Sequence, residues 1–76
     1  MQRVGEVART AQGSLIVRSD DEGFPALGAT VIDQHLEQVG RVVDVIGPVS
    51  RPYIVIRPSA GVIPGNVLHQ RVYTRE

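Results

Sequence analysis

The chain has 76 residues, of which 42% are apolar and 21% charged, with a formal net charge of zero and no cysteine. A single small domain spanning residues 1–76 is expected, and the absence of cysteine excludes disulfides, zinc ribbons and thiol chemistry. The basic residues are all arginines and are spread along the chain. Strong RNA binding by the chain alone is therefore not expected, because such affinity depends on neutralising many phosphates.

The N-terminal sequence MQRVGEV lacks the apolar stretch of a signal peptide. No apolar run approaches the roughly 20 residues that a membrane-spanning helix needs. Together with the absence of cysteine, these features predict a cytoplasmic protein.

Strand signals dominate the chain from its start to its end. The predicted strands are short, rich in Val and Ile, and bounded by Gly, Pro, Asp or Ser. Residues 34–38 form a short connection that can hold at most one turn of helix. In chain order, strands are predicted at residues 3–9, 14–19, 28–33, 39–46, 53–58 and 66–73.

An open sheet of six short strands would expose vulnerable edges, and closure into a barrel removes them. The sequence therefore predicts an all-β fold, a small six-stranded antiparallel β-barrel. In the strand at 53–58, Ile54 and Ile56 are expected to face the interior. Val42 and Val45 are both core candidates of opposite parity, which predicts a β-bulge near residues 43–44.

Candidates for catalysis or metal binding are few. His35 and His69 are the only histidines, whereas a zinc site needs three or four ligands. The acidic run at residues 20–22 lacks EF-hand spacing. Asp33 and Asp44 could pair as acid and base, but a turn role for Asp33 and a bulge role for Asp44 explain them better. The residues predict a non-enzymatic module without a cofactor or a metal.

The stretch GPVSRPY at residues 47–53 is the unusual feature of the chain, because two prolines lie between two predicted strands. Its apolar residues could form a rigid exposed patch suited to binding another protein. They could equally cover one end of the barrel as part of its core. Composition alone leaves both interpretations open for Ile46, Pro48, Val49, Pro52 and Tyr53.

The segment GPVSRPYIVIRP at residues 47–58 resembles the signature of the GAR-domain subunit of H/ACA ribonucleoproteins in its short archaeal form. The pattern is G-P-V, two variable residues, P-Y, and a strand ending in Lys or Arg followed by Pro. The flanking strands follow the same order, so that the resemblance covers residues 4 to about 73. The matching positions are Gly47, Pro48, Val49, Pro52, Tyr53, Arg57 and Pro58.

The resemblance implies a partly split six-stranded barrel of the reductase/translation-factor type. It also implies a non-catalytic subunit that binds the RNA-guided pseudouridine synthase, a relative of dyskerin and TruB, rather than the guide RNA. Such a subunit would favour substrate loading and product release in rRNA pseudouridylation and ribosome biogenesis. The docking role is carried to Ile46, Gly47, Pro48, Val49, Pro52 and Tyr53.

Three alternatives remain at this point. Residues 28–46 also resemble PRC-barrel and ribosome-maturation barrels, although that group has no counterpart of GPVSRPY. A small enzyme or ligand-binding barrel would use His35, His69 and the acidic residues. Autonomous RNA binding is the third alternative, and the neutral net charge argues against it.

Overall fold

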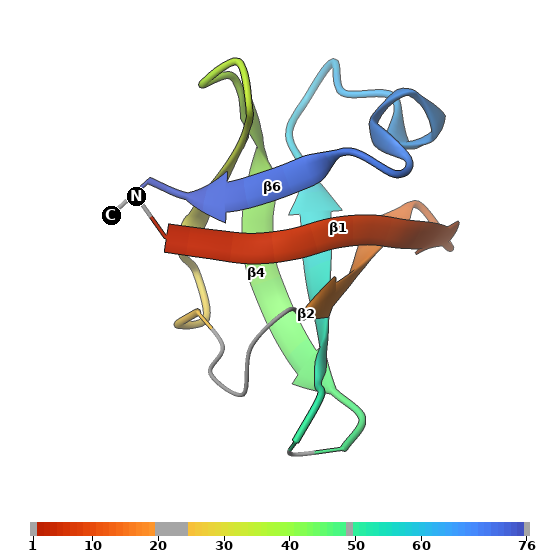
Figure 1. Ribbon diagram of the computed structural model, residues 1–76. Helices are drawn as coiled ribbons and strands as arrows, with labels where there is room; N and C mark the ends of the chain where they lie inside the picture. The colour runs from red at the N-terminus through yellow and green to blue at the C-terminus, as the bar shows by residue number, and fades with distance from the viewer. Residues whose placement is uncertain (1, 20–24, 49, 76) are drawn as a thin grey trace.

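The computed structural model describes residues 2–19, 25–48 and 50–75. Six strands form one closed antiparallel barrel in the order β1-β2-β5-β4-β3-β6. The neighbouring strands β1 and β6 lie side by side and pass in front of β4 in Figure 1. The six-stranded antiparallel barrel is therefore confirmed. The elements are β1 (Gln2–Ala11), β2 (Ser14–Ser19), β3 (Thr30–Asp33), β4 (Gln38–Ile46), β5 (Tyr53–Pro58), the short 3-10 helix η1 (Pro64–Val67) and β6 (Arg71–Thr74).

The core of the barrel consists of the inward-facing apolar residues of all six strands. In β5 the predicted alternation holds, since Ile54 and Ile56 are fully buried while Arg57 is exposed. Val67 of η1 covers one end of this core. The buried cluster comprises Val4, Val7, Leu15, Val17, Val31, Val39, Val42, Ile54, Ile56, Val67 and Val72.

The predicted bulge in β4 is present. The pairing of β4 with β5 shifts register between Val42 and Asp44. Val42 is buried, Val45 packs against the core, and Val43 between them is 44% exposed. The extra residue thus brings two valines of opposite parity to the interior, as a bulge does in a small barrel.

Gly5 and Gly40 mark the places where neighbouring strands approach most closely. A Cβ atom at Gly40 would meet the backbone carbonyl of Arg57 and lie 2.9 Å from Cγ2 of Ile56. A Cβ at Gly5 would meet the backbone carbonyl of Arg18 in the same way. The interpretation of these two glycines as close strand crossings is confirmed.

The sixth predicted strand is wrong over residues 66–70 and correct over residues 71–73. Pro64, which has no N–H to give to a ladder, begins η1 instead. The chain then turns through His69, whose φ is 67°. Strand pairing starts only at Arg71, where β6 enters between β1 and β3. The apolar residues Val67 and Leu68 made this segment resemble a strand in sequence. In the structure, Val67 reaches the core from the 3-10 helix.

The other strand boundaries agree with the prediction to within two residues. β2 and β5 have the predicted limits, β1 is longer at both ends, β4 begins one residue earlier, and β3 begins at Thr30 rather than at residue 28. Within the described ranges, no helical segment has the length and apolar character that crossing a membrane would require.

Candidate functional site

The connection between β4 and β5 contains GPVSRPY and is held by backbone hydrogen bonds at both ends. Arg51 N donates to Pro48 O at 3.2 Å, which closes a turn. Ser19 N of β2 donates to Pro52 O, also at 3.2 Å. Together with two prolines whose φ is restricted, these bonds limit the conformations of the connection.

Gly47 packs directly against Tyr53. Its φ of 89° lies in a region that L side chains rarely adopt. A Cβ atom there would lie 3.2 Å from Cδ2 of the Tyr53 ring. A larger residue at this position would be strained by the backbone conformation and crowded by the ring beside it.

The predicted docking residues differ in their exposure. Gly47 and Pro48 are exposed, Ile46 is 42% exposed, and Tyr53 is half-buried, whereas Pro52 is buried. Pro52 can therefore shape the connection but offers little surface to a partner. Val49, the remaining predicted docking residue, lies outside the described residues.

Tyr53 belongs to the outer face of the barrel. Its cross-strand partner in β4 is Ile46, and its partner in β2 is Arg18. The guanidinium carbon of Arg9 lies 5.9 Å from the centroid of the Tyr53 ring, within the range of a cation–π contact. This contact orders the ring while leaving part of it accessible.

The apolar surface continues from this connection along the outer face of β4 and β5. Val43 is 44% exposed because of the bulge, and the half-buried Val55 lies on the same face. We name this surface the β4–β5 apolar strip. It consists of Val43, Ile46, Pro48, Tyr53 and Val55.

Val43 and Val55 were not among the predicted docking residues. The signal for Val43 was in the sequence, because the bulge that buries Val42 and Val45 must turn the residue between them outward. Other exposed apolar side chains, Leu27, Leu36, Ile63 and Leu68, lie in connections rather than on this strand face. Single exposed apolar residues are ordinary on protein surfaces.

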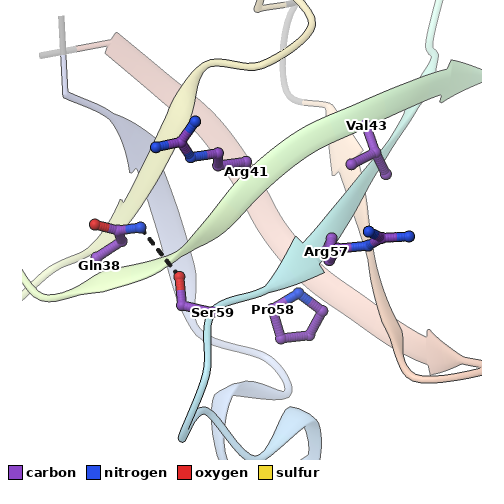
Figure 2. A pocket seen from close by; sticks show the side chains of 6 residues that line it. All are labelled: Gln38, Arg41, Val43, Arg57, Pro58 and Ser59. Carbon is purple, nitrogen blue, oxygen red and sulfur yellow. Dashed lines mark hydrogen bonds between the residues drawn. The ribbon is translucent and has the colours of Figure 1, made fainter.

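A groove of about 320 Å³ lies beside the far end of the strip, where β4 begins and β5 ends (Figure 2). Arg41 and Arg57 are directly opposite each other in the β4–β5 pairing, and Figure 2 shows their guanidinium groups pointing away from one another. Gln38 Nε2 donates to Ser59 Oγ at 3.1 Å. The groove is lined by Gln38, Arg41, Val43, Arg57, Pro58 and Ser59.

Asp33 and Asp44, the candidate acid–base pair, each accept backbone hydrogen bonds close to their own positions in the chain. Asp33 Oδ1 accepts hydrogen bonds from His35 N at 2.8 Å and from Glu37 N at 3.0 Å, which makes Asp33 a turn former. Asp44 Oδ1 accepts from Val45 N at 2.8 Å, inside the bulge. The predicted structural roles of both aspartates are confirmed.

His35 lies in the exposed turn between β3 and β4, and His69 Nδ1 is 3.7 Å from Glu6 Oε2. Among the residues that the structure describes, no three His, Asp or Glu side chains gather as metal ligands would. The acidic run at residues 20–22 lies outside those residues.

Comparison with known proteins places the whole chain in one family. Residues 1–75 match the family model described as Gar1/Naf1 RNA binding region. The chain is 35% identical over 65 residues to an uncharacterised protein of Methanothermobacter thermautotrophicus, a match that covers 84% of this chain and 68% of that protein. It is 42% identical over 50 residues to an uncharacterised protein of Methanocaldococcus jannaschii, covering 66% of this chain and 58% of that protein.

A relative with a functional name is the H/ACA ribonucleoprotein complex subunit GAR1 of Debaryomyces hansenii. It is 30% identical over 59 residues, which cover 78% of this chain but only 27% of the fungal protein. The chain thus spans about a quarter of that relative's length. The names in the family and among the relatives describe an RNA-binding region and a ribonucleoprotein subunit, and none describes an enzyme.

These matches decide against the PRC-type barrel as the family of this chain. A PRC-type barrel accounted only for residues 28–46, whereas the family match runs through the GPV–PY residues and nearly to the C-terminus. The resemblance carried by those residues is confirmed, and the protein is a member of the Gar1/Naf1 family.

Proposed function

We propose that this protein is a non-catalytic subunit of an H/ACA ribonucleoprotein and that it docks through GPVSRPY and the β4–β5 apolar strip onto the catalytic domain of a pseudouridine synthase. The observation that carries the proposal is that backbone hydrogen bonds to Pro48 O and Pro52 O hold the β4–β5 connection, where the exposed Ile46 and Pro48 lie near Tyr53. Family membership and the name of the Debaryomyces hansenii relative support the same assignment. A subunit of this kind would act in the cytoplasm.

The physical argument concerns the entropy of binding. Ordering a flexible loop or a free side chain on association costs free energy, and a surface that is already ordered avoids part of that cost. Here the turn at Pro48, the bond from Ser19 to Pro52 and the Arg9–Tyr53 contact hold the surface before any partner arrives. Tyrosine is also a preferred anchor residue at interfaces.

Polar residues at the edge of the strip suit the rim of such an interface. Arg51 is exposed within the connection itself. Its guanidinium is free to pair with a partner carboxylate at the solvent-accessible margin, where charged groups are common. Its contribution would be to orientation and association rate more than to affinity.

The mechanism follows from differential binding. A subunit that touches the synthase near its substrate-gripping loop biases the loop only by binding one of its states more tightly. The isomerising aspartate belongs to the synthase, so this chain would contribute no reacting group. Favouring the released state would speed turnover wherever product release limits it.

The first test is direct binding. The 76-residue chain is mixed with an archaeal pseudouridine synthase catalytic subunit and analysed by gel filtration. Co-elution as a stable complex is the expected result, because the strip is apolar and already ordered. Separate elution of the two proteins at micromolar concentration would contradict the docking proposal.

The second test separates release from chemistry. Pseudouridylation is measured with and without this protein, under single-turnover conditions and with substrate RNA in excess. The multiple-turnover rate should rise several-fold more than the single-turnover rate, since only the former includes product release. An equal effect on both rates would exclude a role in release.

A further inference from the structure

The Arg41–Arg57 groove combines two like charges that the fold itself does not neutralise. The two residues are direct cross-strand partners, an arrangement that is destabilising for like charges. Within the described ranges neither guanidinium has a carboxylate partner. Of the four described carboxylates, Glu6 lies beside His69, Asp33 and Asp44 accept backbone hydrogen bonds, and the exposed Glu37 pairs with neither arginine.

We propose that this groove binds phosphodiester groups of an RNA strand held in the same complex. Guanidinium groups match phosphate oxygens in geometry and charge. The groove also holds the Gln38 amide and the Ser59 hydroxyl. Such groups commonly contact phosphate or sugar oxygens without reading base sequence. The family's description as an RNA binding region agrees with this ligand.

The direction of the two side chains favours a nucleic acid over an acidic peptide side chain. A single carboxylate would be held best by two converging guanidiniums, whereas those of Arg41 and Arg57 diverge (Figure 2). Diverging positive groups suit a ligand whose negative charges repeat along its length.

A second hollow of about 360 Å³ includes Arg18 and His69. Glu6 also lines it, and its carboxylate would repel an incoming phosphate. The Arg41–Arg57 groove has no acidic residue among those that line it. It is therefore the better candidate for an anion.

The proposal agrees with the zero net charge of the chain. Two phosphate contacts to a single strand correspond to a salt slope of about −1.4 in log K against log salt, at about 0.7 per contact. Binding by the free chain is then weak. In the complex, docking on the synthase would raise the local RNA concentration to about the millimolar range, where weak binding becomes appreciable. This step rests on the proposed function.

The test uses the free chain, so that its result does not depend on docking. Nitrogen-15-labelled protein is titrated with an oligouridylate of about ten nucleotides at about 20 mM salt, and the chemical shifts are followed. Backbone and side-chain signals of Arg41 and Arg57 should shift. The double variant Arg41→Gln/Arg57→Gln should bind at least fivefold more weakly and lose most of the salt slope.

The matched control is Arg71→Gln/Arg75→Gln, which changes the net charge equally. These two exposed arginines lie in or after β6, across the barrel from β5. The affinity of this control variant for RNA should stay within twofold of that of the unmodified chain. The charge-conserving variant Arg41→Lys/Arg57→Lys should retain most of the binding. Because both double variants replace exposed arginines, the thermal midpoint of the groove variant should not fall below that of the control.

Three outcomes would overturn the proposal. The first is no RNA-dependent shift even at low salt. The second is an equal loss of affinity in the groove and control variants, which would indicate diffuse charge attraction. The third is tighter binding of an oligoglutamate peptide than of oligouridylate in the same groove at equal ionic strength. That result would assign the groove to an acidic protein segment instead.

Discussion

Gly40→Ala should destabilise the barrel by about 3 kcal/mol, because the added methyl group has no space to occupy. It would meet the backbone carbonyl of Arg57, and Ile56 Cγ2 would lie 2.9 Å away. A flexible side chain could move aside, but this carbonyl belongs to the backbone of β5, which pairs with β2 on one side and β4 on the other. The two strands would have to separate where β4 and β5 pair at Gly40 and Pro58.

The size of the effect matters because small domains have thin margins. Stability of folded domains is about 0.05–0.15 kcal/mol per residue, so a loss near 3 kcal/mol is a large fraction of the total for a 76-residue chain. Urea denaturation followed by circular dichroism gives the free energy of unfolding directly. A lowered midpoint with an unchanged slope is the expected form of the result.

Gly65→Ala is the matched control. Gly65 lies in η1, is exposed, and a Cβ added there meets nothing within 4 Å. The same chemical change should therefore leave the free energy of unfolding unchanged or raise it by up to about 1 kcal/mol through the unfolded state. Similar stabilities for the two variants would contradict the close approach of β4 and β5.

Much of the fold could be predicted because its signals are local. Alternation in β5 predicted the buried Ile54 and Ile56, and opposite parity of Val42 and Val45 predicted the bulge. The start of β6 could not be predicted, since Val67 is buried but reaches the core from a 3-10 turn. A buried valine in a turn and a buried valine in a strand look the same in sequence.

The site was predictable in part for the same reason. GPVSRPY is contiguous, so the proposed docking residues could be named without knowing the fold. The Arg41–Arg57 groove depends on register, because these two residues meet only when β4 and β5 pair with the bulge counted. The net charge of zero argued against RNA binding, because a total over the whole chain does not reveal a local pair of like charges.

Ile46→Asp should weaken binding to the synthase catalytic subunit at least thirtyfold, a loss of about 2 kcal/mol, if the strip is the docking surface. Ile46 is 42% exposed at the end of β4 and pairs with Tyr53. An aspartate there remains hydrated in the free barrel. On docking it would lose that water against an apolar partner, and burying an unpaired carboxylate is costly.

Measuring the free energy of unfolding of each variant shows whether weaker binding results from a changed surface or from a less stable fold. Ile46 is not part of the buried core, so the substitution should change the free energy of unfolding by less than about 1 kcal/mol. Tyr53→Ala removes the proposed anchor and should weaken binding to a similar extent. It also removes the contact with Arg9, so its stability is measured in parallel.

Leu36→Asp is the control for Ile46→Asp, because it places the same charge on another exposed apolar residue. Leu36 is 63% exposed and lies in the turn before β4, whereas Ile46 ends that strand. β4 covers eight residue steps from Gln38 to Ile46, roughly 26 Å at about 3.3 Å per residue, so the two positions lie at opposite ends of the strand. Isothermal titration calorimetry should give an unchanged dissociation constant for Leu36→Asp. Equal losses in both variants would mean that charge anywhere on the barrel disturbs binding, and an unchanged constant for Ile46→Asp would place the docking surface elsewhere.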